Sequence, residues 1–443
     1  MQSILIANRG EIAVRVIRTC REMGIKTVAI YSEADASSMH VKLADRSICI
    51  GPPEPSKSYL DIPKVMSALE VSNAEGVHPG YGFLSENPKF AEIVRASGKV
   101  FIGPSPETLE LIGDKVKAKE VAKKVGLPLV PGSDGPVDFQ KALEIASRVG
   151  YPVVIKAAAG GGGRGIRVVN NDRELREKLP LAMQEAEVAF GDGRLYLEKY
   201  LMNPKHIEFQ VLADRYGNVL TLGERECSIQ RRHQKLIEES PSSVLGEEKR
   251  KEIEELVADF CREIGYEGAG TVEFLMDQEG NFYFMEMNGR IQVEHPVTEM
   301  VYGIDLVEWQ IRVARGERLE LKKPKRRGYA IECRINAEDP NTFLPSAGKV
   351  EELYLPGGYG VRVDTHLYCG YTVPPFYDSL IAKLIGWGLT REEAIARTLR
   401  ALEEFRLSGK GLRTNIDFHR RVLSSREFHQ GKHHIRFVEE LML

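Results

Sequence analysis

Apolar and polar positions near the N-terminus alternate in a way that predicts strands separated by amphipathic helices. The run SILIAN at 3–8 predicts a strand, EIAVRVIRTCREMG at 11–24 a helix with one apolar face, and KTVAIYS at 26–32 a second strand. The alternation continues through NAEGVHPGYGFLSEN to KVFIGPS. Such a pattern is typical of a parallel sheet covered by helices, so we expect the chain to begin with a doubly wound α/β unit.

Two further units follow in the pattern. A lysine-rich segment closed by Gly126 and Pro128 predicts a helix, after which strand patterns dominate. The basic segment LKKPKRRG at 321–328 predicts a solvated connection, beyond which YAIECRIN, GVRVD and the helical TREEAIARTLRALEEF predict an α+β unit. A length of 443 residues agrees with several cores at roughly 150 residues each. The domains that we expect are 1–112, 113–325 and 326–443.

Composition limits the classes of protein that remain. The chain has 42% hydrophobic and 28% charged residues, and no apolar run approaches the roughly 18 residues of a membrane span. Its first residues lack the features of a signal peptide, so we expect a cytoplasmic protein. A net charge of −3 gives no general attraction to nucleic acid or membrane. The six cysteines are scattered without a C-x-x-C pair, which predicts buried free thiols.

Glycine-rich segments indicate which phosphate-binding chemistry is possible. The first turn, Asn8 to Glu11, lacks the G-x-G-x-x-G spacing and so disfavours a nicotinamide dehydrogenase. In KAAAGGGGRGIRVV at 156–169, Lys156 precedes the glycines, whereas a P-loop lysine follows them. Strand patterns flank the glycines, so we expect a hairpin tip that can approach a ligand closely; a mobile surface loop is the alternative.

Paired carboxylates in the segment GTVEFLMDQEGNFYFMEMNGRIQVEHPVTE provide a second indication. If Glu279 and Gly280 are the central residues of a hairpin turn, Glu273 lies opposite Glu286, and Asn288 projects to the same face. Opposed like charges are destabilising, so the pattern predicts a cation, and hard oxygen ligands favour Mg²⁺. A lysine or arginine partner, or a register one residue away, would remove that need. Together with the glycine tip, the carboxylates predict ATP-dependent phosphoryl transfer.

Several segments in this order resemble one family, the biotin carboxylases, which are the ATP-grasp components of biotin-dependent carboxylases. The segments are ILIANRGEIAVRVIR, HPGYGFLSEN, FIGPSPETLELIGDK, KAAAGGGGRGIRVV, LEKYLMNPKHIEFQVL, GERECSIQRRHQK, EMNGRIQVEHPVTE, AIECRINAEDP and VPPFYDSLIAKLI. The resemblance implies an ATP-grasp region with a mobile glycine-rich lid at about 130–200, between a Rossmann-like N-terminal domain and a biotin carboxylase C-terminal domain.

The resemblance also implies site residues. Those that would bind ATP are Lys115, Lys156, Gly160, Gly161, Gly162, Gly163, Glu198, Lys199, Leu201, His206, Gln230 and His233. Those that would bind Mg²⁺ or Mn²⁺ are Glu273, Glu286 and Asn288. Bicarbonate would lie against Lys235, Arg290, Gln292 and the backbone of Val293. Glu294 would be the general base, Arg334 would stabilise the enolate-like oxygen of biotin, and Tyr81 would line the biotin pocket.

Plainer interpretations of some residues stay open. His206 and His233 could be ordinary polar residues at the surface, which is the commoner place for a histidine. The segment 231–235 could be a solvated basic turn, and we expect His295 to be structural. Position 289 is Gly where the family has Thr or Ser, which predicts a more flexible segment.

Two other functions remain as alternatives. One is a different ATP-grasp ligase that activates a carboxylate, which Arg334 and the IQVEHP segment disfavour. The other is a nucleotide-sensing regulatory subunit, which the set Lys235, Arg290, Glu294 and Arg334 disfavours. The chain lacks a Met-Lys-Met biotinylation segment, so we expect a separate biotin carboxyl carrier protein, a separate carboxyltransferase subunit and a homodimer. The final acceptor (acetyl-CoA, another acyl-CoA, pyruvate or 2-oxoglutarate) is left open.

Overall fold

The computed structural model describes residues 1–157 and 166–442. Its N-terminal unit is a five-stranded parallel sheet in the order β3-β2-β1-β4-β5, which confirms the predicted α/β unit. The strands are β1 (Ser3–Ile6), β2 (Lys26–Ser32), β3 (Arg46–Gly51), β4 (Gly76–His78) and β5 (Val100–Phe101). The helices are α1 (Gly10–Glu22), α2 (Met39–Leu43), α3 (Ile62–Ser72), α4 (Pro88–Ala96) and α5 (Pro106–Gly113), with short 3₁₀ turns at Glu33–Asp35 and Pro55–Lys57.

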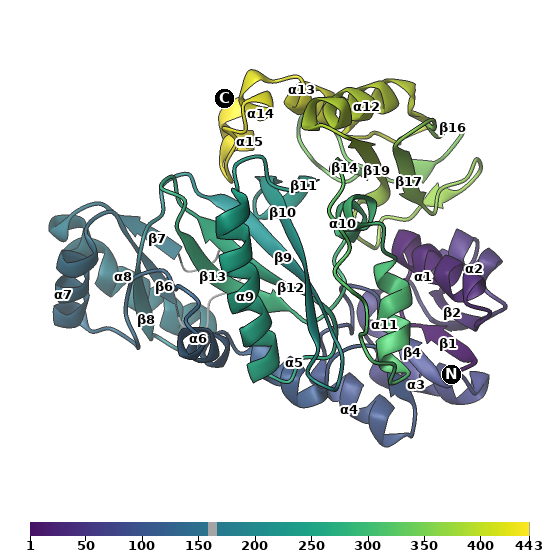
Figure 1. Cartoon of the computed structure of the whole chain (residues 1–443), viewed down its shortest axis with the longest axis horizontal. Coiled ribbons are helices and arrows are strands. Elements are labelled where there is room, and N and C mark those ends of the chain that lie inside the picture. Colours follow the sequence, from purple (N-terminus) through teal and green to yellow (C-terminus); the bar gives the residue numbers. More distant parts are fainter. Residues whose placement is uncertain (158–165, 443) are drawn as a thin grey trace.

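A small antiparallel sheet in the order β7-β6-β8 forms a separate lobe (Figure 1). Its elements are α7 (Phe139–Val149), β6 (Val153–Ala157), β7 (Ile166–Val169), α8 (Asp172–Phe190) and β8 (Leu195–Lys199). The lobe has its own core, which includes Ile155, Leu175 and Leu197. The predicted hairpin around the glycines is confirmed by the pairing of Lys156 with Ile166, whereas the tip with Gly160 to Gly163 lies outside the described residues. The preceding α6 (Lys115–Lys124) is the predicted lysine-rich helix.

An eight-stranded sheet in the order β13-β12-β9-β10-β11-β14-β19-β17 forms the centre of the molecule. Its strands are β9 (Lys205–Ala213), β10 (Val219–Arg231), β11 (Gln234–Ser240), β12 (Gly268–Met276), β13 (Phe282–Asn288), β14 (Tyr329–Asn336), β17 (Val361–Thr365) and β19 (Leu380–Gly388). The strands after residue 325 therefore extend the central sheet, although the sequence suggested a unit of their own. The domain boundaries stay a prediction.

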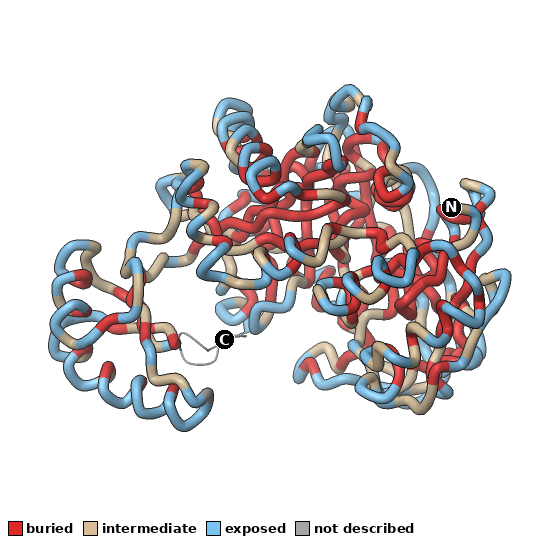
Figure 2. The backbone as a smooth tube through the Cα atoms, turned by 90° about the horizontal axis from the view of Figure 1, so that it is seen from below, coloured by how far each residue is buried: buried red, intermediate tan, exposed pale blue. Residues whose placement is uncertain are grey.

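Alternation along these strands separates an apolar face from a polar one. Phe209 of β9 and Phe274 of β12 pack under α9 (Glu247–Glu263), as their shared core cluster shows. The intervening positions, such as Glu208 and Glu273, therefore point to the other face, which is covered by α10 (His295–Tyr302) and α11 (Leu306–Ala314). Buried backbone is concentrated in this sheet and the N-terminal unit, while the small lobe is largely exposed (Figure 2).

The C-terminal helices cover the far end of the central sheet. They are α12 (Arg391–Glu404), α13 (Ile416–Leu423), α14 (Arg426–His429) and α15 (Phe437–Leu441), and two short ribbons pair β15 (Gly348–Lys349) with β18 (Thr372–Val373) and β16 (Glu352–Tyr354) with β20 (Arg406–Ser408). The chain then returns to the centre, where the Ile435 amide donates to the Pro204 carbonyl at 3.1 Å. The basic segment 321–328 has no helix or strand, as predicted for a connection.

The structure can be compared with two expectations from composition, the buried thiols and the missing membrane span. All six cysteines are free, but only four are buried, because Cys49 and Cys369 are exposed. The prediction that all are buried is therefore wrong for those two. Among the described residues, no helix has the length and apolarity that a membrane span needs.

Candidate active site

The β12–β13 hairpin places two carboxylates opposite each other. Glu273 pairs with Glu286, as predicted, although the turn differs from the expected one. Asp277 and Asn281 close the turn, so three residues form the loop and not two. Met285 is an extra residue between the pairs Phe274–Phe284 and Glu273–Glu286, and this bulge restores the expected register.

Glu273 is the buried partner of that pair and has several polar contacts. Lys235 Nζ lies 3.0 Å from its carboxylate, Gln292 Nε2 donates at 2.7 Å and Asn288 Nδ2 at 2.8 Å. His206 Nε2 is 3.0 Å away. Burial raises the pKa of Glu273, but Lys235 and His206 outweigh burial and lower it well below its usual range. Glu273 is therefore ionised at neutral pH.

Glu286, in contrast, is half-exposed and has a looser partner. Lys115 Nζ, at the start of α6, lies 3.6 Å from its carboxylate. A cavity of about 220 Å³ opens beside it, lined by residues that include Glu86, Lys115, Glu286 and Asn288. Glu286 and Asn288 line this cavity, and Glu273 lies opposite Glu286 on the hairpin. Two carboxylates and an amide oxygen at this end of the hairpin fit a hydrated Mg²⁺ that also contacts a substrate phosphate. The structure thus brings together the residues predicted to hold the metal.

Lys235 joins three carboxylates beneath this hairpin. Its Nζ lies 2.5 Å from Glu208, 3.0 Å from Glu273 and 2.7 Å from Glu294. Burial lowers the pKa of Lys235, but the three carboxylates outweigh burial and raise it well above its usual value. The ammonium group therefore stays charged and holds the carboxylates in one cluster.

Glu294 lies between two cations. Arg334 Nη2 donates to its carboxylate at 2.9 Å, opposite the contact from Lys235 at 2.7 Å, and Arg334 Nε donates to Glu238 at 2.5 Å. Burial raises the pKa of Glu294, yet Lys235, Arg334 and the buried Arg225 outweigh it and lower the pKa well below 4.5. The carboxylate is thus ionised, in the form that accepts a proton.

Arg290 extends from the end of β13 toward the same cavity. Its Nε donates to Glu86 at 2.9 Å and its Nη2 donates to Asn288 Oδ1 at 3.1 Å. Glu86 also accepts from the Gly289 amide at 3.0 Å. An added Cβ at Gly289 would lie 2.7 Å from Ile112 and 2.9 Å from Leu109. The segment is thus closely packed at this position, and its expected flexibility stays a prediction.

The remaining substrate-binding candidates lie around the start of α10. The Val293 carbonyl accepts from Lys383 Nζ at 2.8 Å, and Lys383 lies 3.2 Å from Glu11. The Tyr81 hydroxyl donates to Glu11, which connects the N-terminal unit to the cluster. His295 is structural, as expected, because its Nδ1 donates to the Gln292 carbonyl at 2.7 Å and the ring is fully buried.

The nucleotide-binding candidates divide between the small lobe and the central sheet. Glu198 accepts from Lys156 and, at 2.7 Å, from Lys119. Burial raises the pKa of Glu198, but these two lysines outweigh it and lower the pKa. Lys199 Nζ donates to the carbonyls of Gly150 and Tyr151 at 2.9 and 3.0 Å, so its side chain supports the lobe's backbone. Leu201 is partly exposed in the linker to β9.

The two histidine candidates differ in environment. His206 is buried beside Glu273, so its interpretation as a surface residue is wrong. Gln230 lies next to it, with its Nε2 3.4 Å from His206 Nδ1 and donating to the Cys227 carbonyl at 3.1 Å. His233 is exposed in the turn between β10 and β11, with a φ of 65°, as the basic-turn interpretation expected. The structure does not bring it into the Glu294 cluster, and its contact with ATP stays a prediction.

Several residues of this cluster were missed by sequence reasoning. Arg225 is fully buried and donates to Glu208 at 2.6 Å and Gln210 at 2.6 Å. Glu86, Glu208, Glu238 and Lys383 were missed as well. The available signal was charge inside strand patterns, as in HIEFQ and GERECS, where an ordinary buried strand has apolar residues on both faces.

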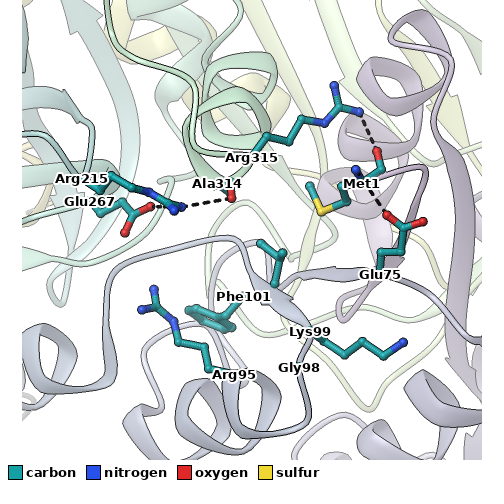
Figure 3. Close-up of a pocket in the computed structure, with 11 residues that line it drawn as sticks. Met1, Glu75, Arg95, Gly98, Lys99, Phe101, Arg215, Glu267, Ala314 and Arg315 are labelled. Atoms are coloured by element: carbon teal, nitrogen blue, oxygen red, sulfur yellow. Dashed lines mark hydrogen bonds and ion pairs between the residues drawn. The ribbon is translucent and has the colours of Figure 1, made fainter.

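A cavity of about 740 Å³ lies away from this cluster, at the junction of the N-terminal unit with β9–β10 and α11 (Figure 3). Its lining includes Arg95, Lys99 and Arg315, which follow or end helices α4 and α11. Arg95 and Arg315 donate to the carbonyls of Gly103 and Met1 at 3.3 and 2.8 Å. Cations at helix C-termini compensate the helix dipole, which explains their presence there.

Comparison with known proteins agrees along the whole chain. Family models match the biotin carboxylase N-terminal domain at residues 1–109, the carbamoyl-phosphate synthase L chain ATP-binding domain at 114–322 and the biotin carboxylase C-terminal domain at 332–440. A biotin carboxylase from Haemophilus influenzae is 55% identical over 444 residues, which cover 99% of this chain and 98% of that protein.

Solved structures show the same similarity. The biotin carboxylase domain dimer of Hydrogenobacter thermophilus 2-oxoglutarate carboxylase, in complex with MgADP, ADP and bicarbonate, has a TM-score of 0.90 at 51% identity and covers 99% of this chain and 97% of that one. A biotin carboxylase from Campylobacter jejuni, in a β,γ-ATP complex, has a TM-score of 0.93 at 50% identity and covers 99% of this chain and 98% of that one.

Proposed function

Because the chain belongs to the biotin carboxylase family, we propose that it carboxylates biotin with ATP and bicarbonate at the cluster of Lys235, Glu294 and Arg334. The observation that carries this assignment is the position of Glu294. Its buried carboxylate is 2.7 Å from Lys235 and 2.9 Å from Arg334, so a base and two anion-binding cations meet at one point. An anion entering here finds positive charge next to a group that removes a proton.

In the first step bicarbonate binds in place of some of these ion pairs. Lys235 and the planar fork of Arg290 hold its oxygens, together with Gln292 and the backbone at Val293. As Lys235 turns to the substrate, its hold on Glu294 weakens, and the carboxylate becomes a stronger base. Glu294 then takes the proton of bicarbonate, whose oxygen attacks the γ-phosphate of ATP to give carboxyphosphate and ADP.

ATP lies between the small lobe and the central sheet in this proposal. Lys115 and Lys156 bind its phosphates, and the glycine tip closes over them; Glu198, Lys199, Leu201, His206, Gln230 and His233 complete the set. Mg²⁺ or Mn²⁺ held by Glu273, Glu286 and Asn288 would neutralise charge on the phosphates. Glu198, which pairs with both Lys156 and Lys119, keeps the phosphate-binding lysine in place.

In the second step carboxyphosphate gives CO₂ and phosphate, the phosphate removes the ureido proton of biotin, and the ureido nitrogen then bonds to CO₂. Arg334 stabilises the enolate-like oxygen that forms, and Tyr81 lines the pocket. Biotin arrives on a carrier protein and leaves to a carboxyltransferase subunit, and the chain works as a homodimer, as the dimeric relative supports. Six free thiols are typical of a reducing compartment and support our proposal of a cytoplasmic location.

ADP release by the purified protein with Mg-ATP tests this function, with bicarbonate and free biotin each added or omitted. We expect release that requires bicarbonate, rises with biotin and is lost in Glu294→Gln. Arg334→Ala should lose the rise with biotin, whereas the exposed Glu70→Gln should match the parent. Hydrolysis that ignores both additions, or that needs another carboxylate, would instead support the general ATP-grasp ligase.

A further inference from the structure

Two fully buried glutamates face each other beside the proposed biotin site. Glu238 of β11 pairs with Glu332 of β14, and both side chains have 0% exposure. Directly opposed residues on antiparallel strands have Cβ atoms about 5 Å apart and project to the same face. The two carboxyl groups therefore lie close together without access to water.

These carboxyl groups have fewer hydrogen-bond donors than ionised oxygens need. Glu238 accepts from Arg334 Nε at 2.5 Å through Oε1. Its Oε2 and both oxygens of Glu332 have no hydrogen-bond partner among the described residues. Two ionised carboxylates here would repel each other and would leave three acceptors unsatisfied. One proton between them removes the repulsion and supplies a donor.

The charged groups around the pair agree with a retained proton. Glu238 faces Arg334, Glu294 and Lys235; burial raises its pKa to about 7, although Arg334 lowers it. Glu332 faces Lys383 as well as Arg334, Glu238 and Glu294. Burial raises the pKa of Glu332 well above its usual value, because Lys383 and Arg334 compensate only in part.

Two buried thiols lie near the pair. Cys227 lies on the same face as Glu208 and Glu294, whereas Cys333, next to Glu332 along β14, points to the opposite face, into the apolar core with Ile237. Burial raises the pKa of each thiol well above its usual value, so both stay neutral and supply no charge that would replace the proton.

The pair matters to catalysis through Arg334. The guanidinium lies between Glu238 and Glu294. The side chains of Asn415 and His419 bind the backbone carbonyl of Arg334, at 3.0 and 2.7 Å, and not its guanidinium. Glu294, as the general base, takes up a proton during turnover and then holds Arg334 less strongly. Glu238 is the contact that remains throughout.

We propose that Glu238 and Glu332 hold one proton between them and are positioning residues for Arg334, with Glu238 keeping the guanidinium in place while Glu294 changes its protonation state. This rests on the proposed function for Arg334 and Glu294, but the proton itself does not. Glu332 holds the proton, so the pair keeps one negative charge, and Glu238 presents that charge to Arg334.

Infrared spectra of the intact protein over a pH titration test the proton directly. We expect a protonated-carboxyl band that persists to neutral pH in the parent and in Glu70→Gln but is missing in Glu332→Gln. The pair also makes stability depend on pH. A carboxyl whose pKa is raised on folding stabilises the folded state fully below its unfolded pKa, and this contribution is lost as pH rises through the folded pKa. The melting temperature of Glu332→Gln should therefore rise relative to that of the parent as the pH increases from 5 to 9.

The infrared and melting experiments decide whether Glu238 and Glu332 share a proton. An unchanged band in Glu332→Gln, or a melting difference that is constant with pH, would overturn the shared proton. If Glu332→Gln does not fold, Glu332→Met gives the same two comparisons. Because neither measurement involves turnover, both test the shared proton even if the protein proves to have another activity.

Kinetics test the positioning role. We expect Glu238→Gln to lower kcat for biotin-dependent ADP release by 10-fold or more, to leave KM for ATP within 2-fold, and to retain the slow release without biotin. Glu238→Asp, which keeps the charge, should recover part of the loss. An equal fall with and without biotin, or a matching rise in KM for ATP, would show a general disturbance of the fold and overturn the role.

Discussion

Glu273 and Glu286 have the same side chain and face each other, yet their surroundings make them different residues. Glu273 is buried and contacts Lys235, His206, Asn288 and Gln292, whereas Glu286 has, among the described residues, only the distant Lys115 as an ion-pair partner. Neutralising Glu273 would disturb the whole cluster. Glu286 is therefore the residue at which metal binding is tested without loss of the fold.

We expect Glu286→Gln to raise the Mg²⁺ concentration that gives half-maximal ADP release by roughly 10-fold or more, since a neutral amide is a weaker ligand of the same shape. The Mg²⁺ dependence is measured at fixed ATP. Glu279→Gln, in the exposed turn of the same hairpin, is the matched control. Equal Mg²⁺ dependence in the two variants would remove Glu286 from the metal site.

Gly289 is a second residue whose role depends on its neighbours. Because a Cβ there would meet Ile112 at 2.7 Å and Leu109 at 2.9 Å, Gly289→Thr should destabilise the protein by about 1–3 kcal/mol. Urea unfolding measures the change, and the added substitution Ile112→Ala should recover part of it. A Thr variant as stable as the parent would show that these two side chains move aside at little cost.

Among the elements, those defined by local patterns were predicted and those defined by distant pairing were not. The alternation before residue 112 predicted the parallel sheet, and a hairpin of short loop predicted that Glu273 lies opposite Glu286. The partners Glu86 and Glu238 were missed, because each meets its arginine across more than ninety residues, with separations of 204 and 96. No period of 2 or 3.6 in a sequence records such contacts.

The C-terminal segment gives a prediction at this scale. His433 Nε2 lies 2.9 Å from Glu226 of β10 and 3.4 Å from Glu239 of β11, and the residue lies shortly before α15 in the chain. Burial lowers the pKa of His433, but these carboxylates outweigh burial and raise it. The stabilisation is therefore complete below the unfolded pKa of about 6.5 and is lost as pH rises through the higher folded pKa.

We expect His433→Gln to cost about 2 kcal/mol at pH 6, the usual worth of hydrogen bonds to a charged group, and less at pH 9. Because Ile435 binds the Pro204 carbonyl next to the linker of Leu201, KM for ATP should rise more than KM for bicarbonate. Urea unfolding at the two pH values and initial rates give both quantities, with the exposed His429→Gln as control. A cost that is the same at both pH values would contradict a charged His433.

For the whole molecule, the continuous eight-stranded sheet implies that the central and C-terminal units fold together. β11 pairs with β14, so a cut at residue 325 would leave the inner edge of the sheet open and would separate Glu238 and Glu239 from Arg334 and Arg391. Unpaired buried charges and an open strand edge both favour aggregation. The small lobe, in its described part, has its own core and a sheet separate from the central one.

The two tryptophans allow this to be measured, because Trp309 belongs to α11 and Trp387 to β19, and both pack on one hydrophobic core. We expect single-tryptophan variants, Trp309→Phe and Trp387→Phe, to give one common midpoint in urea. A tryptophan introduced at Tyr196 of β8 should report an earlier transition of the small lobe, which Mg-ATP shifts upward because ligand binding stabilises the folded form. Separate midpoints for Trp309 and Trp387 would mean that residues 326–443 unfold independently despite the shared sheet, and the fragment 1–325 should then be soluble and folded.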